Sequence, residues 1–210
     1  MLYLYVDQIS PSVTTLGPGK RIVLWVQGCS LRCFGCMSAE LFERQVNSRV
    51  KVSDITKKII SYAPGHAGVT ISGGEPFEQA EALTELLLHL RDNTSLDIMI
   101  YSGYRREEIL KNSAAMLKLL SLTDILVDGR YRSDLPTDKP WCGSDNQFIY
   151  LLSNRAQAYS RLIKGEFKIA PRIQVEITAE KEVRVIGIPR RGELDRLKIE
   201  LMKKGIVLKK

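Results

Sequence analysis

The stretch GCSLRCFGCMS, residues 28–38, holds three of the chain's four cysteines, Cys29, Cys33 and Cys36. It follows a short run rich in β-branched residues, so a predicted strand leads directly into the cysteines. Three thiolates at this C-x3-C-x2-C spacing can bind three irons of a 4Fe–4S cluster, which normally takes four cysteines. The fourth iron would then stay open to an outside ligand. The spacing therefore favours an iron–sulfur cluster.

Two other interpretations of the cysteines stay open from spacing alone. Cys142 or His66 could complete a tetrahedral zinc site, although structural zinc usually draws its ligands as two close pairs. Cys33 and Cys36 could form a redox dithiol, but that interpretation gives Cys29 no role.

The composition is that of an ordinary globular chain. It has 210 residues, 44% of them hydrophobic and 26% charged, which is enough to bury a core without disulfide staples. The start, MLYLYVDQIS, shows no basic leader before an apolar segment, and no run approaches the roughly 18 apolar residues of a membrane span. We therefore expect a cytoplasmic protein with no membrane partner. In that reducing compartment, clustered cysteines bind metal or catalyse more often than they form disulfides.

The chain is basic, with a formal net charge of +7 and a pI of about 9.2. Much of the excess lies in the stretch PRRGELDRLKIELMKKGIVLKK at the end of the sequence. Such a stretch can contact nucleic acid or an acidic protein face. No basic platform with interleaved aromatic residues and no known nucleic-acid motif accompanies it, so a nucleic-acid partner is not expected.

Strands and helices alternate between residues 21 and 129. The period and flanking residues predict strands at 21–28, 68–72, 96–103 and 124–129, and helices at 53–63, 76–92 and 104–122. We expect Ser53 to cap the first helix, Pro76 to begin the second, and the third to break near Asn112 and Ser113. Alternation of this kind indicates right-handed βαβ units and a parallel sheet, which is the α/β class.

The alternation ends after the fourth strand. Residues 129–147 are polar, with two prolines and two glycines, and predict a long loop of the kind that often carries function. Residues 172–189 predict a β-hairpin that turns near 179–181, and residues 192–205 predict a helix. We find no repeat and no convincing linker, so we expect residues 1–210 to form one domain.

Three unusual segments each follow a predicted strand: GCSLRCFGC, SGGEP and YSGY. Ligands of parallel sheets gather beyond the carboxyl ends of the strands, so we expect these segments to meet at one edge. In SGGEP, residues 72–76, two glycines let the backbone approach a ligand beside a helix start, although Glu75 could simply cap that helix.

The cysteine spacing after a first strand, followed by GGEP after a second, strongly resembles the radical S-adenosylmethionine enzymes. This resemblance implies a partial (β/α) barrel, here with a C-terminal hairpin and helix, and cluster ligation by Cys29, Cys33 and Cys36. It implies that S-adenosylmethionine chelates the open iron. The resemblance also implies that the GGEP segment holds the methionyl amino group of S-adenosylmethionine; the candidate residues there are Ser72, Gly73, Gly74, Glu75 and Pro76.

Most members of that family have an aromatic residue just before the third cysteine, where its backbone reaches the adenine. Here Gly35 occupies that position, which is typical of the branch with the anaerobic ribonucleotide reductase activating proteins. The similarity runs over about residues 15–150 and includes LGPGKRIVLWVQGC, DILVDGRY and the Gly-Ser-x-Asn-Gln part of WCGSDNQ. It implies cofactor contacts by Gly35, Met37 and Ser102, whereas the extension from about residue 155 to 210 matches no family known to us.

The branch implies an enzyme that takes hydrogen from a glycine of a partner, a glycyl-radical enzyme, with flavodoxin or ferredoxin as reductant. A fourth thiolate on the cluster would block S-adenosylmethionine, so Cys142 is not expected to be a ligand. Asn146 and Gln147 either cover the site or bond to the backbone. Two alternatives remain: a radical enzyme that modifies a small molecule or peptide, and a non-enzymatic zinc or iron–sulfur binding module.

Overall fold

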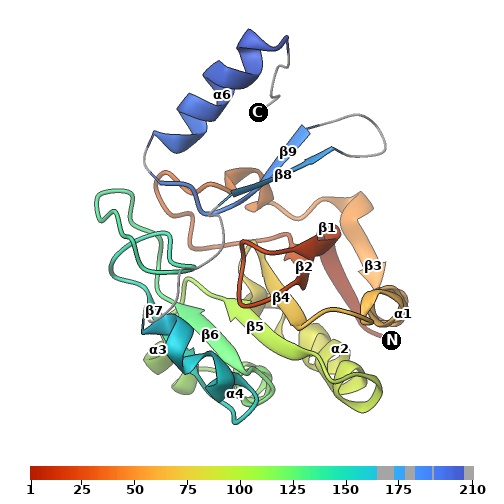
Figure 1. Cartoon of the computed structure of the whole chain (residues 1–210). Helices are drawn as coiled ribbons and strands as arrows, with labels where there is room; N and C mark the ends of the chain where they lie inside the picture. Colours follow the sequence, from red (N-terminus) through yellow and green to blue (C-terminus); the bar gives the residue numbers. More distant parts are fainter. Residues whose placement is uncertain (165–172, 178–182, 191, 206–210) are drawn as a thin grey trace.

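The computed structural model describes residues 1–164, 173–177, 183–190 and 192–205. Its centre is a seven-stranded sheet with the strand order β3-β1-β2-β4-β5-β6-β7 (Figure 1). The strands are β1 (Tyr3–Val13), β2 (Arg21–Val26), β3 (Arg49–Lys51), β4 (Gly68–Gly73), β5 (Asp97–Tyr101), β6 (Ile125–Asp128) and β7 (Phe148–Leu151).

The four predicted strands are confirmed as the parallel centre of the sheet, β2, β4, β5 and β6. The outer strands β1, β3 and β7 pair antiparallel and were not predicted. β1 contains Pro11, which cannot donate a ladder hydrogen bond, and the pairing of β1 with β2 shifts register between Ser10 and Val13. The α/β class is confirmed, and among the described residues β3 and β7 are the edge strands of this sheet.

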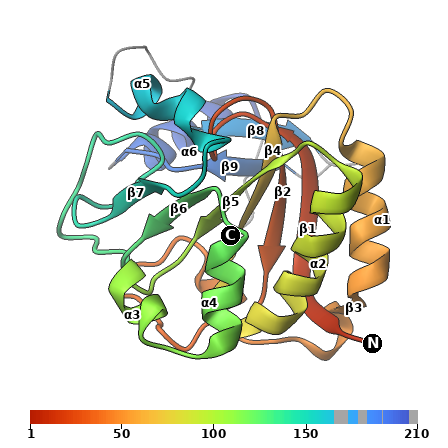
Figure 2. The same ribbon diagram turned by 90° about the horizontal axis from the view of Figure 1, so that it is seen from below.

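Helices cover one face of the sheet, here called the outer face (Figure 2). They are α1 (Val52–Tyr62), α2 (Ala80–Asn93), α3 (Arg106–Leu110) and α4 (Ala114–Ser121). The predicted break is confirmed, because Ser113 caps α4 by accepting a hydrogen bond from the Met116 amide. The expected cap of the first helix was wrong, because α1 begins at Val52 after Lys51 and Ser53 lies inside it. Pro76 is confirmed at a helix start, since it begins the 3-10 helix η3 (Pro76–Gln79), which leads directly into α2.

The two faces of β2 show how the core divides. Ile22, Leu24 and Val26 point into the outer core, which they share with the helices. Val23 and Trp25 alternate with them and point to the inner face, where both are buried in a second core cluster. Complete burial on both faces explains why β2 has a continuous apolar run.

The inner face is covered by segments from the second half of the chain. The hairpin of β8 (Ile173–Ile177) and β9 (Val183–Gly187) lies over β1 and β2 (Figure 1). Ile186 belongs to the same buried cluster as Val23 and Trp25. The predicted hairpin is confirmed, while its expected turn at 179–181 lies outside the described residues. The remaining elements are η1 (Ala39–Leu41), η2 (Val46–Ser48), η4 (Ala156–Tyr159), α5 (Ser160–Ile163) and α6 (Glu193–Lys203), the last being the predicted terminal helix.

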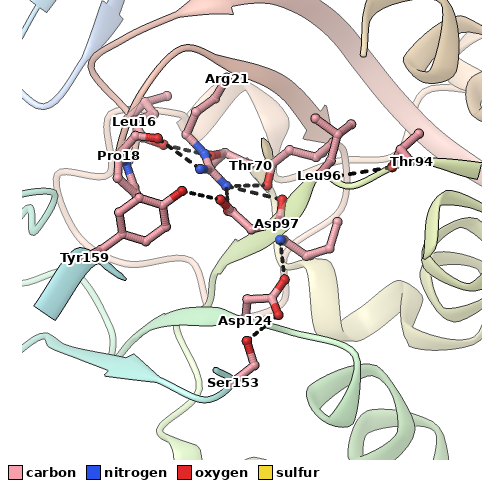
Figure 3. Close-up of polar contacts among 12 residues, drawn as sticks. Leu16, Pro18, Arg21, Thr70, Thr94, Leu96, Asp97, Asp124, Ser153 and Tyr159 are labelled. Atoms are coloured by element: carbon pink, nitrogen blue, oxygen red, sulfur yellow. Dashed lines mark hydrogen bonds and ion pairs between the residues drawn. The ribbon is translucent and has the colours of Figure 1, made fainter. Parts of the chain in front are cut away.

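A buried polar network joins the starts of the parallel strands on the inner face (Figure 3). The fully buried guanidinium of Arg21 donates from Nη2 to Asp97 Oδ1 at 2.5 Å and from Nε to Thr70 Oγ1 at 2.7 Å. Tyr159 donates from its hydroxyl to Asp97 Oδ2 at 2.7 Å, and burial together with this bond raises its pKa to about 12. Each charged group has a partner, which is the condition for burying a charge in a protein interior.

No helix among the described residues is long and apolar enough to cross a membrane.

Candidate active site

The cysteine loop begins where β2 ends. Its entry is fixed by backbone hydrogen bonds, from the Gly28 amide to the Leu41 carbonyl at 2.8 Å and from the Cys29 amide to the Phe42 carbonyl at 3.0 Å. Cys29, Cys33 and Cys36 are half-buried free thiols on this loop. All three thiols therefore lie on the loop that follows β2, the strand that the sequence predicted before the cysteines.

The chemistry of these thiols fits an iron–sulfur cluster. Burial raises the pKa of Cys29 and of Cys36, so cationic iron would be needed to hold them as thiolates. Among the described residues, no three His, Cys, Asp or Glu side chains are close enough to bind one metal ion. A cluster places each thiolate on a separate iron and does not require that closeness. Cys142 lies elsewhere, 1% exposed in the inner core with Trp141 and Met99.

The SGGEP turn is bonded to the end of β2. The Gly74 amide donates to the Val26 carbonyl at 2.7 Å, and the Glu75 amide donates to the Gly28 carbonyl at 2.8 Å. A Cβ atom on Gly73 would lie 2.4 Å from the Val26 carbonyl oxygen, and one on Gly74 would lie 2.3 Å from that of Gly28. Protein backbone thus fills the space that a side chain would need at these two positions, and the approach of a ligand to this turn remains a prediction. The two glycines are required by the fold itself.

The Glu75 carboxylate links the SGGEP segment to the YSGY segment. It is 1% exposed and accepts hydrogen bonds from the Phe77 amide at 3.0 Å, the Ser102 hydroxyl at 2.9 Å and the Gly103 amide at 2.7 Å. Burial outweighs these three donors and raises the pKa of Glu75 to about 7. The side chain caps η3, as one interpretation of the sequence had it, and it also ties the turn after β4 to the turn after β5.

The third segment, YSGY, follows β5 and contacts both of the other segments. The Ser102 hydroxyl accepts from the Tyr104 amide while it donates to Glu75, so it is occupied by a turn contact in this structure. A Cβ on Gly103 would lie 2.4 Å from Leu31 of the cysteine loop. The prediction that the three segments meet at one edge of the sheet is confirmed, and contact of Ser102 with the cofactor remains a prediction.

The long loop 129–147 lies beside the cysteine loop. Gly35 has a φ of +72°, a conformation that favours glycine, and a Cβ there would lie 3.3 Å from that of Ser133. The Gln147 side chain accepts from the Gly143 amide at 2.7 Å and donates to the Gly129 carbonyl at 2.9 Å, so it orders the loop by bonding to backbone. Asn146 likewise donates to a backbone carbonyl, that of Arg130. Met37 is 50% exposed.

The sequence alone did not indicate Ser30 and Glu78, two residues whose contact links the cysteine loop to the turn after β4. Glu78 lies one helical turn beyond Glu75, and its carboxylate accepts from the Ser30 amide and hydroxyl. The available signal was the second acid in GGEPFE, three positions after the first, which places both carboxylates on the same side of a helical turn.

Comparison with known proteins matches residues 15–150 to the family model described as a 4Fe-4S single cluster domain. The anaerobic ribonucleoside-triphosphate reductase-activating protein of Enterobacteria phage T4 is 32% identical over 149 residues, which are 69% of this chain and 92% of that protein. The pyruvate formate-lyase-activating enzyme of Staphylococcus aureus (strain USA300) is 36% identical over 98 residues, 44% of this chain and 39% of that protein. The crystal structure of QueE from Escherichia coli aligns over 98% of this chain and 92% of its own, with a TM-score of 0.43 and 13% identity. This chain therefore belongs to the 4Fe-4S single cluster domain family, within the activating-protein branch of the radical S-adenosylmethionine enzymes.

Proposed function

We propose that this protein cleaves S-adenosylmethionine reductively and uses the resulting radical to take a hydrogen atom from a glycine of a partner enzyme. The observation that carries the proposal is the convergence of three free thiols with the SGGEP and YSGY turns at one sheet edge. The cluster, when bound and reduced, would supply the one electron needed to break the S–C5′ bond of S-adenosylmethionine, with methionine and a 5′-deoxyadenosyl radical as the products.

The chain's own residues would hold and orient these groups. Cys29, Cys33 and Cys36 would bind three irons, and the absence of Cys142 from the loop leaves the fourth iron open. The backbone of 73–76, anchored on β2, would hold the methionyl end. Gly35, Met37 and Ser102 would surround the nucleoside. Glu75 acts through the two turns that it joins, because its carboxylate oxygens accept hydrogen bonds from protein donors.

A protein partner is supported by the names of the relatives, both of which describe proteins that activate another enzyme. The reacting glycine would have to lie in near-contact with the 5′ carbon, because abstraction of hydrogen depends on a positioned donor. Flavodoxin or ferredoxin as the electron donor is part of this proposal.

Anaerobic reconstitution tests the first half of the proposal. The cluster-loaded protein, mixed with S-adenosylmethionine and dithionite, should form 5′-deoxyadenosine and methionine in equal amounts. Cys33→Ala should form neither. If the wild-type protein with an intact cluster forms no 5′-deoxyadenosine under strong reduction, the proposed chemistry is wrong.

One observation favours a second candidate, a radical enzyme that modifies a small molecule or a peptide. The hairpin β8–β9 lies outside the matched residues 15–150 and covers the inner face beside Trp25. Thr15 donates to the Ile186 carbonyl at 3.3 Å, which fixes the hairpin on the loop between β1 and β2. A hairpin that covers the inner face in this way would suit a substrate that is smaller than a partner enzyme. The source of the hydrogen atom found in 5′-deoxyadenosine separates the two candidates.

A further inference from the structure

We infer that Glu78 is a positioning residue that clamps the cysteine loop to the two cofactor turns, and so sets where S-adenosylmethionine lies relative to the cluster. The inference rests on the proposed function, because it concerns the placement of that cofactor. It assigns a role to a carboxylate outside the Cys-x3-Cys-x2-Cys and GGEP motifs.

The clamp consists of contacts to the residue that follows the first cysteine. Glu78 Oε1 accepts from the Ser30 amide at 3.0 Å and from the Ser30 hydroxyl at 2.5 Å, while Oε2 lies 3.3 Å from the same amide. The Tyr104 hydroxyl of the third segment donates to the same Oε1 at 3.4 Å. One carboxylate oxygen thus receives donors from two segments that are far apart in the sequence.

The backbone of Glu78 is itself held firmly. Its amide donates to the Glu75 carbonyl at 3.1 Å within η3, and its carbonyl accepts from Arg44 Nη2 at 3.3 Å. The neighbouring Phe77 is 1% exposed and anchors the turn in the outer core. The carboxylate therefore projects from a fixed turn toward the cysteine loop.

The clamp has a geometric consequence for the first cysteine. Cys29 is held by its amide to the Phe42 carbonyl on one side, and the next residue is held by Glu78 on the other. The same turn carries Glu75, whose amide donates to the Gly28 carbonyl. Without Glu78, three cysteines would remain to bind the cluster, but the loop would lose its side-chain link to the turn that would hold the methionyl group. Loss of Glu78 should therefore leave assembly of the cluster intact but impair the positioning of S-adenosylmethionine.

The test compares Glu78→Ala, Glu78→Gln and a control, Glu81→Ala, which removes an exposed carboxylate from the first turn of α2. Each reconstituted protein is assayed for iron and sulfide, for S-adenosylmethionine affinity by equilibrium dialysis, and for the electron paramagnetic resonance spectrum of the reduced cluster with and without S-adenosylmethionine. Gln keeps an acceptor oxygen for Ser30, whereas Ala removes it.

We expect Glu78→Ala to keep the iron and sulfide of the wild type, to bind S-adenosylmethionine about tenfold more weakly, and to show a reduced spectral change on its addition. Glu78→Gln should recover most of the affinity and the spectral change, and Glu81→Ala should match the wild type. The inference is overturned if Glu78→Ala binds S-adenosylmethionine with wild-type affinity and spectrum. It is also overturned if Glu78→Ala loses iron, because Glu78 would then be needed to bind the cluster rather than to position S-adenosylmethionine. If the wild-type protein binds no S-adenosylmethionine, the proposed function fails instead.

Discussion

The buried carboxyl of Glu75 gives the sharpest prediction about the site, and Glu75→Gln is the perturbation that tests it. Burial raises its pKa from 4.5 to about 7 in the folded protein. Between these values the folded state keeps a proton that the unfolded chain has released, so folding is favoured at low pH. The contribution to stability is fully present below pH 4.5 and is lost as the pH rises through about 7.

The size follows from the difference between the two pKa values. At about 1.4 kcal/mol for each pKa unit, a rise from 4.5 to about 7 corresponds to about 3 kcal/mol. The glutamine variant cannot ionise at this position, so its stability lacks this dependence on pH. It has its own constant cost, because its amide nitrogen faces donors such as the Gly103 amide.

Urea unfolding of the reduced, metal-free protein from about pH 5 to about pH 8 measures the effect. The free energy of unfolding of the wild type should fall by about 3 kcal/mol relative to Glu75→Gln over this range, since groups that do not interact with Glu75 titrate equally in both proteins. Glu81→Gln, an exposed change in the next turn, should instead run parallel to the wild type. If Glu75→Gln also runs parallel to the wild type, the carboxyl ionises normally and the argument from burial is wrong.

Two further predictions concern the metal and the fold. Cys33→Ala should lose most iron after reconstitution while Cys142→Ala keeps it, because Cys142 is buried in the inner core; equal losses would contradict the three-cysteine site. Arg21→Met should cost about 3–5 kcal/mol by leaving the Asp97 carboxylate buried without its cation. Tyr159→Phe, which removes one hydrogen bond to the same carboxylate, should cost about 1 kcal/mol. Urea unfolding measures both, and equal costs would show that the Arg21 charge is not what the network needs.

The sequence revealed the parallel centre of the sheet because its strands are buried on both faces. β2 carries a short apolar run and β4 a short run rich in β-branched residues, each bounded by turn residues, and the chain alternates them with amphipathic helices. β1 lacked such a signal because polar residues and Pro11 interrupt it, and its pairing depends on the neighbours that tertiary structure supplies. β7 is partly exposed and follows directly on the long loop, so its four residues gave no clear period.

Part of the candidate site could likewise be predicted from the sequence, and part of it could not. The cysteines and SGGEP stand out because each is a compact local pattern. The contacts that assemble them join residues distant in the sequence, as Ser30 with Glu78 and Gly103 with Glu75, and no local pattern records such pairs. The cover of the inner face by Ile186 is likewise a long-range contact. The backbone contact of Gly74 shows the converse case, in which a recognised motif residue serves protein packing.

Transfer of deuterium from a glycine-labelled partner enzyme into 5′-deoxyadenosine tests the central claim most directly. The cluster-loaded protein would be mixed anaerobically with S-adenosylmethionine, a reductant and a glycyl-radical partner whose glycines carry deuterium on the α-carbon. The account predicts one deuterium in the 5′-deoxyadenosine and, with the unlabelled partner, a carbon-centred doublet in the electron paramagnetic resonance spectrum that collapses on labelling. 5′-Deoxyadenosine without deuterium, formed as quickly when a small molecule or short peptide replaces the partner, would contradict it.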